Sequence, residues 1–220
     1  MKDYIKKSWI FFIKLFWIFI LGSFFGYIVE TIYAYIISGG HFVVRQGLVY
    51  GPFIQVYGLG AMIYYILLLK TQDTKKVFIY SFFMGGALEY ICSFMQEIFL
   101  KSISWDYSGS FLNLNGRTNF VYCIFWGLIG IAFLKIFWRF VPNLDKVASS
   151  KKWRFITYIL MIFIFFDITI SCMACTRQNE RHKNIPPKNS LDSFLDTKYP
   201  DDFMNKIYNN KILIINENDT

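Results

Sequence analysis

Residues 10–37 read IFFIKLFWIFILGSFFGYIVETIYAYII, an apolar run in which Lys14 and Glu30 are the only charged residues. A helix needs about 20 consecutive, mostly apolar residues to cross the hydrocarbon core of a membrane. Four further stretches meet this requirement, at residues 48–69, 77–100, 120–141 and 153–175. The sequence therefore predicts an all-α, polytopic helical membrane protein with about five transmembrane helices in residues 1–175, followed by a polar C-terminal tail at residues 176–220.

The composition and the distribution of charge agree with this prediction. Charged residues make up 17% of the 220 residues, against about 25% in a typical soluble domain. Residues 2–14, 70–76 and 135–154 contain thirteen lysines and arginines, whereas the loops predicted on the other side contain only Arg45, Lys101 and Arg117. Because cytoplasmic loops carry the excess of positive charge, we expect a multi-pass protein of the cell membrane with a cytoplasmic N-terminus and an outer tail. The net charge of +8 then faces anionic lipids and predicts no nucleic-acid partner.

Several catalytic and metal-binding motifs are absent from the sequence. It contains no G-x-x-x-x-G-K-[ST] phosphate loop, no H-E-x-x-H zinc motif and no G-x-S-x-G nucleophile elbow. Its only histidines are His41 and His182, and the single C-x-x-C pair, Cys172 and Cys175, lacks a second pair of ligands. We therefore predict no ATPase activity by the phosphate-loop route, no metal site and no cofactor in this chain. Whether the chain is an enzyme stays open.

Glutamates inside the predicted spans are the strongest functional signal. Gly22, Gly26 and Glu30 recur every four residues, so the face of the first span that allows close packing also directs Glu30 into the bundle. Glu89 begins a polar stripe on the third span that includes Gln96. A charge inside the membrane costs about 2.5–3.5 kcal/mol on insertion scales and usually faces a cavity or a partner. Two interpretations stay open: an outward-facing pocket for a cation, proton or polar headgroup, and structural glutamates hydrogen-bonded between helices.

Two arginines are expected beside those glutamates. Arg45 precedes the second span, and Arg117 lies in the loop KSISWDYSGSFLNLNGRTNF, residues 101–120, with Asp106 and Asn115. A guanidinium at the membrane edge can hold a carboxylate or a phosphate with two hydrogen bonds. Two roles stay open for these arginines: binding of a solute in the pocket, and attachment of the outer loops to acidic residues of the first and third spans.

The stretch RQGLVYGPFIQVYGLG, residues 45–60, is unusual for the start of a membrane span. Its glycines permit irregular backbone, and Pro52 breaks the hydrogen-bond ladder of a helix. Irregular backbone at membrane depth survives only where it lines a cavity or is buried in protein. We expect this segment to line the pocket with Gln55 and Tyr57; the alternative is a kinked, tightly packed helix.

Taken together, these motifs resemble those of the CmpB family, which carries a type IV ABC-transporter label and is grouped with the vertebrate transmembrane protein 229 group. The resemblance rests on RQGLVYGPFIQVYGLG, on Glu30 with Tyr33, on ALEYICS around Glu89, and on WDYSGSFLNLNGRTNF at residues 105–120. It covers about residues 20–140 well and the tail loosely. Gln55 departs from the proline that is usual there, which affects the geometry at the start of the helix. The family label implies a permease component of an ABC transporter.

We therefore interpret the chain as a membrane permease or transporter component with an outward-facing polar pocket and an unidentified substrate. The pocket would contain Glu30, Arg45, Gln55, Tyr57, Glu89, Gln96, Asp106, Asn115 and Arg117. The expected partners are membrane lipids, together with a separate ATPase subunit or further copies of the chain. Two alternatives stay open: a membrane enzyme that handles lipid headgroups, and a structural or regulatory membrane protein without turnover.

Overall fold

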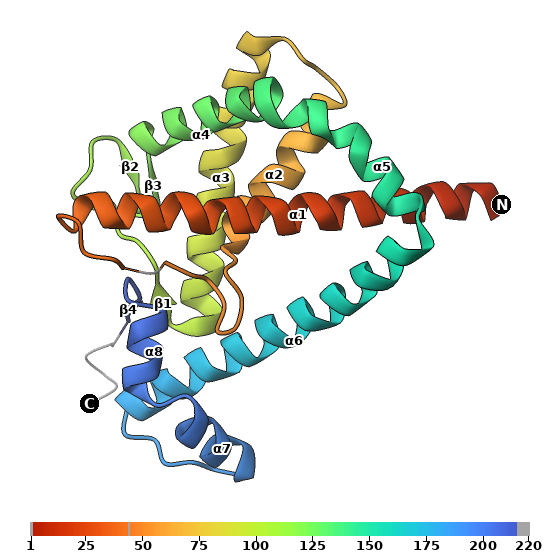
Figure 1. Cartoon of the computed structure of the whole chain (residues 1–220). Helices are drawn as coiled ribbons and strands as arrows, with labels where there is room; N and C mark the ends of the chain where they lie inside the picture. The colour runs from red at the N-terminus through yellow and green to blue at the C-terminus, as the bar shows by residue number, and fades with distance from the viewer. Residues whose placement is uncertain (1, 44, 215–220) are drawn as a thin grey trace.

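A computed structural model describes residues 2–43 and 45–214, and helices dominate it (Figure 1). The helices are α1 Lys2–Ile37, α2 Gln55–Leu68, α3 Thr74–Leu100, α4 Phe120–Ala132, α5 Val141–Ser149, α6 Lys151–His182, α7 Ser190–Lys198 and α8 Asp201–Ile207. A short π-helix, η1 Phe133–Phe137, and a 3-10 helix, η2 Trp138–Phe140, join α4 to α5. The strands form two small antiparallel pairs, β1 Ser102–Ile103 with β4 Ile212–Leu213 and β2 Asn113–Leu114 with β3 Thr118–Asn119.

Within the described part of the chain, 4 helical segments are long and apolar enough to cross a membrane. They are Lys7–Ile37 of α1, the whole of α3, Phe120–Ser149 from α4 to α5, and α6. This confirms the prediction of an all-α, polytopic membrane protein. Helix α2 is apolar but has only 14 residues. At about 1.5 Å per residue it is shorter than the roughly 30 Å hydrocarbon core.

The predicted second span, residues 48–69, is helical only from Gln55 to Leu68. Residues 48–54 are irregular, because Pro52 lacks an amide hydrogen and disfavours a helical conformation of the residue before it. The amide of Ile54 donates a hydrogen bond of 3.0 Å to the carbonyl of Ser23, so α2 begins beside the middle of α1. The prediction of an irregular backbone is confirmed, and the alternative of a continuous kinked helix is wrong.

Small residues set the closest approaches between helices. A methyl group added to Gly26 of α1 would overlap the ring of Tyr57 on α2. On α2, a methyl group added to Gly58 would meet the backbone of α1, and on α3 one added to Gly85 would overlap Trp126 of α4. The expected role of the glycine faces is therefore confirmed, because a larger side chain at these positions would push the helices apart.

The two ends of the bundle differ in charge. In Figure 1 the N-terminus, the link between α2 and α3, and helix α5 lie toward the top and right. The loops at residues 38–43, 45–54 and 101–119, and the tail from 183 to 214, lie toward the left and bottom. The three basic segments singled out in the sequence thus share one end of the molecule, and the other end carries the irregular loops.

The polar tail folds back onto α6 and contains two short helices and a strand. Helix α6 continues to His182, beyond the predicted boundary at residue 175, and α7, α8 and β4 follow it. An apolar cluster joins the tail to α6 and to the irregular loop; it comprises Val49, Ile170, Ala174, Cys175, Leu195, Tyr199 and Met204. Strand β4 pairs with β1, which places the tail beside the loop that follows α3.

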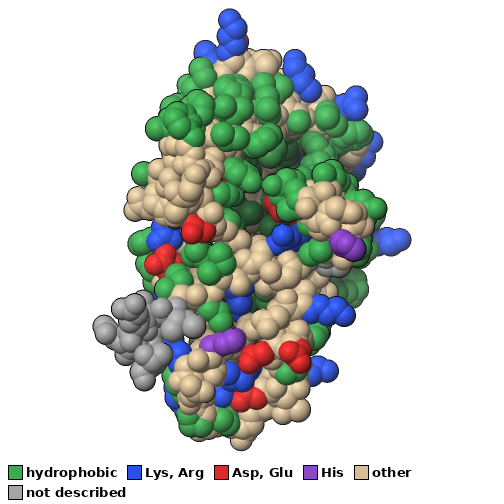
Figure 2. Space-filling model, turned by 90° about the vertical axis from the view of Figure 1, so that its left-hand side faces the viewer, with side chains coloured by type: hydrophobic (Ala, Val, Ile, Leu, Met, Phe, Trp, Pro, Cys, Tyr) green, Lys and Arg blue, Asp and Glu red, His purple; other side chains and the backbone are tan. Residues whose placement is uncertain are grey.

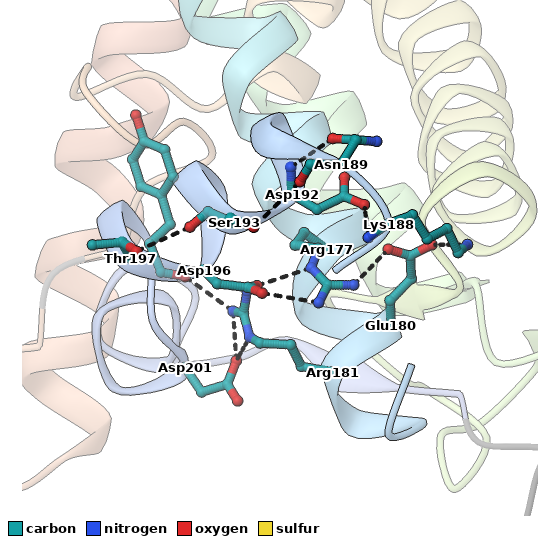
Figure 3. A network of polar contacts seen from close by, with 11 residues as sticks. Arg177, Glu180, Arg181, Lys188, Asn189, Asp192, Ser193, Asp196, Thr197 and Asp201 are labelled. Carbon is teal, nitrogen blue, oxygen red and sulfur yellow. Dashed lines mark hydrogen bonds and ion pairs between the residues drawn. The ribbon is translucent and has the colours of Figure 1, made fainter. Parts of the chain in front are cut away.

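A network of ion pairs, called here the tail network, completes this contact (Figure 3). Arg177 donates two hydrogen bonds of 2.9 Å to the carboxylate of Asp196 and one to Glu180. Arg181 donates to Asp196 at 2.7 Å and to Asp201 at 2.6 Å. The guanidiniums of α6 therefore hold α7 and the first residue of α8 in place. Lys188 also pairs with Glu180.

Candidate functional site

The irregular loop at residues 45–54 is held in place by side chains that accept hydrogen bonds from its backbone amides. The amide of Tyr50 donates to Asp167 of α6 at 3.0 Å, and the amide of Val49 donates to Ser171 at 2.9 Å. Both acceptors are buried. Gln55, expected in the pocket, donates instead to the carbonyl of Gly47 at 3.1 Å. This loop therefore obtains from α6 and from Gln55 the hydrogen bonds that a helix would have supplied.

The loop after α3 shapes itself through local hydrogen bonds. Asn115 and Gly116 both have positive φ, 53° and 68°, as in the type I′ turns that favour Asn-Gly in hairpins, and they join β2 to β3. Asp106 accepts from the amide and the hydroxyl of Ser108 at 2.9 and 2.6 Å, and these donors lower the pKa of its carboxyl. The predicted site residues Asp106 and Asn115 are thus exposed turn residues that position the hairpin.

That hairpin places two donors on Glu89 of α3. Thr118 of β3 donates to its carboxylate at 2.8 Å, and the phenol of Tyr107 donates at 3.1 Å. Burial raises the pKa of Tyr107, so its hydroxyl keeps the proton that it donates. Glu89 is 6% exposed. A buried acidic side chain is therefore accommodated by neutral donors from a loop that comes from outside the helix.

Glu30 of α1 lies in the same region. Its carboxylate accepts a hydrogen bond of 2.7 Å from Tyr57 of α2, and the ring of Tyr57 packs against Trp126 of α4 at 5.7 Å between centroids. Thr118, which donates to Glu89, contacts Cys123 of the same helix α4 at 3.7 Å. We call these residues the glutamate cluster: Glu30, Tyr57, Glu89, Tyr107 and Thr118.

Arg117 does not join the glutamate cluster. Its guanidinium pairs with Glu97 and donates to Ser93 at 3.4 Å, and it lies over the ring of Phe94 at 5.3 Å. Gln96 accepts a hydrogen bond of 3.0 Å from Ser104. The residues of the predicted polar stripe on α3 therefore have different roles. Glu89 belongs to the glutamate cluster, whereas the stripe residues nearer the end of α3 form hydrogen bonds to the hairpin and to the segment around β1.

Arg45 also remains apart from the acidic residues. Its backbone amide donates to the hydroxyl of Thr31 at 3.5 Å, and Thr31 follows Glu30 in the sequence. The Nε atom of its guanidinium is buried without a hydrogen-bond partner. Among residues 2–43 and 45–214, Arg45 forms no ion pair with a carboxylate. The expected pairing of Arg45 with Glu30 is therefore not present in the structure.

The geometry brings part of the predicted site together. Glu30, Tyr57 and Glu89 meet in the cluster, whereas Gln55, Gln96, Asp106, Asn115, Arg45 and Arg117 serve or adjoin the surrounding loops. Figure 2 views the end of the molecule that carries the loops and shows a hollow between apolar side chains, with acidic and basic groups near it. Two acidic groups without a basic partner can attract a cation in such surroundings.

Three residues that build the site were not among the predicted site residues, although Asp167 was noticed in the sequence. Tyr107 and Thr118 are the donors to Glu89, and Asp167 anchors the irregular loop. The motif WDYSGSFLNLNGRTNF contains Tyr107 and Thr118, but their spacing in the sequence does not predict a contact with α3. Asp167 was visible as the one charge inside the last predicted span, and an intramembrane carboxylate with no periodic partner signals a distant contact.

Comparison with known proteins adds a family. A family model described as "Putative ABC-transporter type IV" (ABC_trans_CmpB) matches residues 17–172, well over half of the chain. The match covers the second and third candidate spans completely and about two thirds of the first and the last, and it includes both glutamates, the irregular loop and the hairpin. Searches of curated proteins and of solved structures give no significant match.

Proposed function

Because the chain belongs to the family described as "Putative ABC-transporter type IV", we propose that it is the membrane permease component of a transporter. In this proposal the glutamate cluster binds a cation, or the positively charged group of a solute. A separate subunit supplies ATP hydrolysis, since this chain has no phosphate loop. The site faces the outside, because the basic segments lie at the opposite end of the bundle and face the cytoplasm of the cell.

One observation carries the proposal. Glu30 and Glu89 come from different helices and receive hydrogen bonds from Tyr57, Tyr107 and Thr118. Both sets of donors adjoin α4, because Tyr57 packs against Trp126 and Thr118 contacts Cys123. The buried carboxylate of Glu89 and the half-buried carboxylate of Glu30 have neutral donors and no ion pair among the described residues. Such a pair leaves a place for a positive charge, which a proton, a metal ion or an ammonium group can fill.

Chemical labelling of the carboxyl groups tests this site. Dicyclohexylcarbodiimide, an apolar reagent, modifies protonated carboxyl groups in membranes, and peptide mass spectrometry locates the adduct. We expect Glu30 or Glu89 to be labelled, and Na⁺, K⁺ or guanidinium ions to reduce the labelling. Glu97 serves as the internal control, because it pairs with Arg117, whereas Glu30 and Glu89 form no described ion pair.

Two outcomes would contradict the cation site. Labelling of Glu89 that none of the three cations reduces would show that no added cation competes at this carboxyl. Equal labelling of Glu89 and Glu97 would show that the missing basic partner makes no difference. The Glu89→Gln variant identifies the adduct, because it removes the reactive carboxyl and preserves the size of the side chain.

The second part of the proposal concerns the ATPase. The tagged protein, purified gently from its own membrane, should retain an ATPase subunit in stoichiometric amount by mass spectrometry. Absence of such a subunit would contradict the ATP-driven mechanism. If cations still reduced the labelling of Glu89 in that case, the cation site would remain supported.

A further inference from the structure

A second site lies at the opposite end of the bundle, where α2 turns into α3. A groove of about 480 Å³ opens there, within the range of about 300–1,000 Å³ that is usual for small-molecule sites. It is lined by Ile66, Leu67, Lys70 and Thr71 from the end of α2, and by Lys76, Tyr80 and Met84 from α3. None of these residues belongs to the glutamate cluster, so the groove is independent of the proposed transport site.

The lining of the groove changes from basic to apolar along the helices. On α3, Lys76, Tyr80 and Met84 recur every four residues and therefore share one face. Lys76 is in the first turn of the helix, and Met84 lies about 12 Å deeper at 1.5 Å per residue. Ile66 lies in the last turn of α2, and Lys70 follows in the turn after the helix end at Leu68. The groove is thus charged at its mouth and apolar inside.

The two lysines at the mouth are available to a ligand. In residues 2–43 and 45–214, neither Lys70 nor Lys76 has a carboxylate partner. The nearest acidic residue in sequence, Asp73, accepts a hydrogen bond of 2.9 Å from the backbone amide of Lys76 as the N-cap of α3. Deeper in the groove, Ile66 and Tyr80 are exposed, so apolar surface continues from the lysines toward the middle of the helices.

We propose that this groove binds one phospholipid with an anionic headgroup. The phosphate contacts the ammonium groups of Lys70 and Lys76, and the first part of an acyl chain lies along Ile66, Tyr80 and Met84. Charge complementarity favours an anionic headgroup over a zwitterionic one, because each lysine near a membrane surface favours anionic lipid by about 1 kcal/mol. The depth of the apolar part favours a whole lipid over free phosphate, because free phosphate has no acyl chain to contact the apolar side chains.

Native mass spectrometry in a mild non-ionic detergent tests the proposal. The probes are phosphatidylglycerol and phosphatidylcholine with identical acyl chains, and glycerophosphoglycerol as the same headgroup without chains. We expect the protein to retain one phosphatidylglycerol in preference to phosphatidylcholine, and to retain no glycerophosphoglycerol. Lys70→Gln with Lys76→Gln should lower the affinity for phosphatidylglycerol about 30-fold, at about fivefold per lysine.

Matched variants distinguish this groove from general surface charge. Lys75 neighbours Lys76 but does not line the groove, so Lys75→Gln should lower the affinity much less than Lys76→Gln. Met84→Trp should fill the apolar part and displace the lipid, whereas Ile91→Trp, at an exposed position of α3 outside the groove, should not.

Three results would overturn the proposal. Equal retention of the two phospholipids by the unmodified protein would remove the charge argument. Equal losses in Lys75→Gln and Lys76→Gln would replace the groove with a diffuse basic surface. Retention of glycerophosphoglycerol as firmly as of phosphatidylglycerol would show an anion site that makes no use of the acyl chains.

Discussion

The glutamate cluster and the tail network are two groups of carboxylates in the same chain, and only the tail network contains its own cations. In the tail network, Asp196 receives hydrogen bonds from two guanidiniums, and Arg177 is 2% exposed. In the glutamate cluster, Glu89 is nearly as buried, but the hydrogen bonds that it receives come from neutral side chains, among them the hydroxyls of Tyr107 and Thr118. The tail network is therefore electrically complete within the protein, and the glutamate cluster is not.

This difference separates stability from ligand binding. A buried ion pair whose partners satisfy one another loses several kcal/mol when one partner is removed, because the other charge is left uncompensated. A carboxylate held by neutral donors loses less when it is neutralised, because its donors can still bond to the uncharged form. We therefore expect mutations in the tail network to unfold the tail, and mutations in the glutamate cluster to change the response to cations.

The largest effect should follow Arg177→Ala. This substitution leaves Asp196 and Glu180 without their shared partner, and we expect it to destabilise the docking of the tail by about 3 kcal/mol. Limited proteolysis of residues 190–207 in mild detergent measures the loss. Lys198→Ala is the control, because Lys198 is exposed and belongs to no described ion pair. Equal protection of the tail in both variants would contradict the role of Arg177.

The next effect should follow Glu89→Gln in the glutamate cluster. Loss of one unit charge beside a bound cation should weaken cation protection against labelling of Glu30 at least about fivefold, since such a charge contributes about 1–4 kcal/mol. The thermal stability of the protein should change by less than about 1 kcal/mol. Glu97→Gln should have the opposite pattern of effects, because Glu97 pairs with Arg117. Cation protection of Glu30 should be unchanged, and the attachment of the hairpin to α3 should be weakened.

Lowering the pH should act on the tail network through Asp196. The guanidiniums of Arg177 and Arg181 hold the pKa of its carboxyl below the usual value, which is about 3.9 in unfolded chains. The ion pairs therefore stabilise the tail fully above about pH 5, and this contribution is lost as the pH falls through the pKa of the folded state. Hydrogen exchange of α7 from pH 7 to pH 3 measures it, and Asp196→Asn should remove that pH dependence.

The smallest effect should follow Tyr107→Phe. The substitution removes one of the two described donors to Glu89 and should cost about 1 kcal/mol, or a few degrees in the midpoint of thermal unfolding. Tyr35→Phe is the control, because the exposed ring of Tyr35 donates no described hydrogen bond. A shift of the midpoint that is no larger for Tyr107→Phe than for the control would show that Tyr107 is dispensable.

Much of the membrane part of this fold was predictable from local patterns. The apolar runs predicted helices, and the fourfold spacing of Gly22, Gly26 and Glu30 predicted both the close approach of α2 and the direction in which Glu30 points. These predictions succeed because helix periodicity alone decides which residues share a face. The irregular backbone near Pro52 was predictable for the same reason, since proline acts on its own neighbours.

The partners of the polar groups were not predictable in this way. Asp167 accepts a hydrogen bond from the amide of Tyr50, which is 117 residues away in the sequence. For Arg117 the sequence left two roles open, and the structure shows the attachment of its loop to α3 through Glu97. Both contacts depend on the position along α3 and α6 at which each loop packs against the helix. The tail shows the same limit, because its equal numbers of acidic and basic residues do not reveal which of them meet.

The sequence by itself determined that this chain is a helical membrane protein, which helix faces pack, and which acidic residues point inward, because hydrophobicity and helix periodicity are local properties. Only the tertiary structure decided that Glu30 and Glu89 lack cations while Asp196 has two. Pairing between charges depends on where loops and helix ends meet in space, and an ion pair forms only when both groups are brought within a few ångströms.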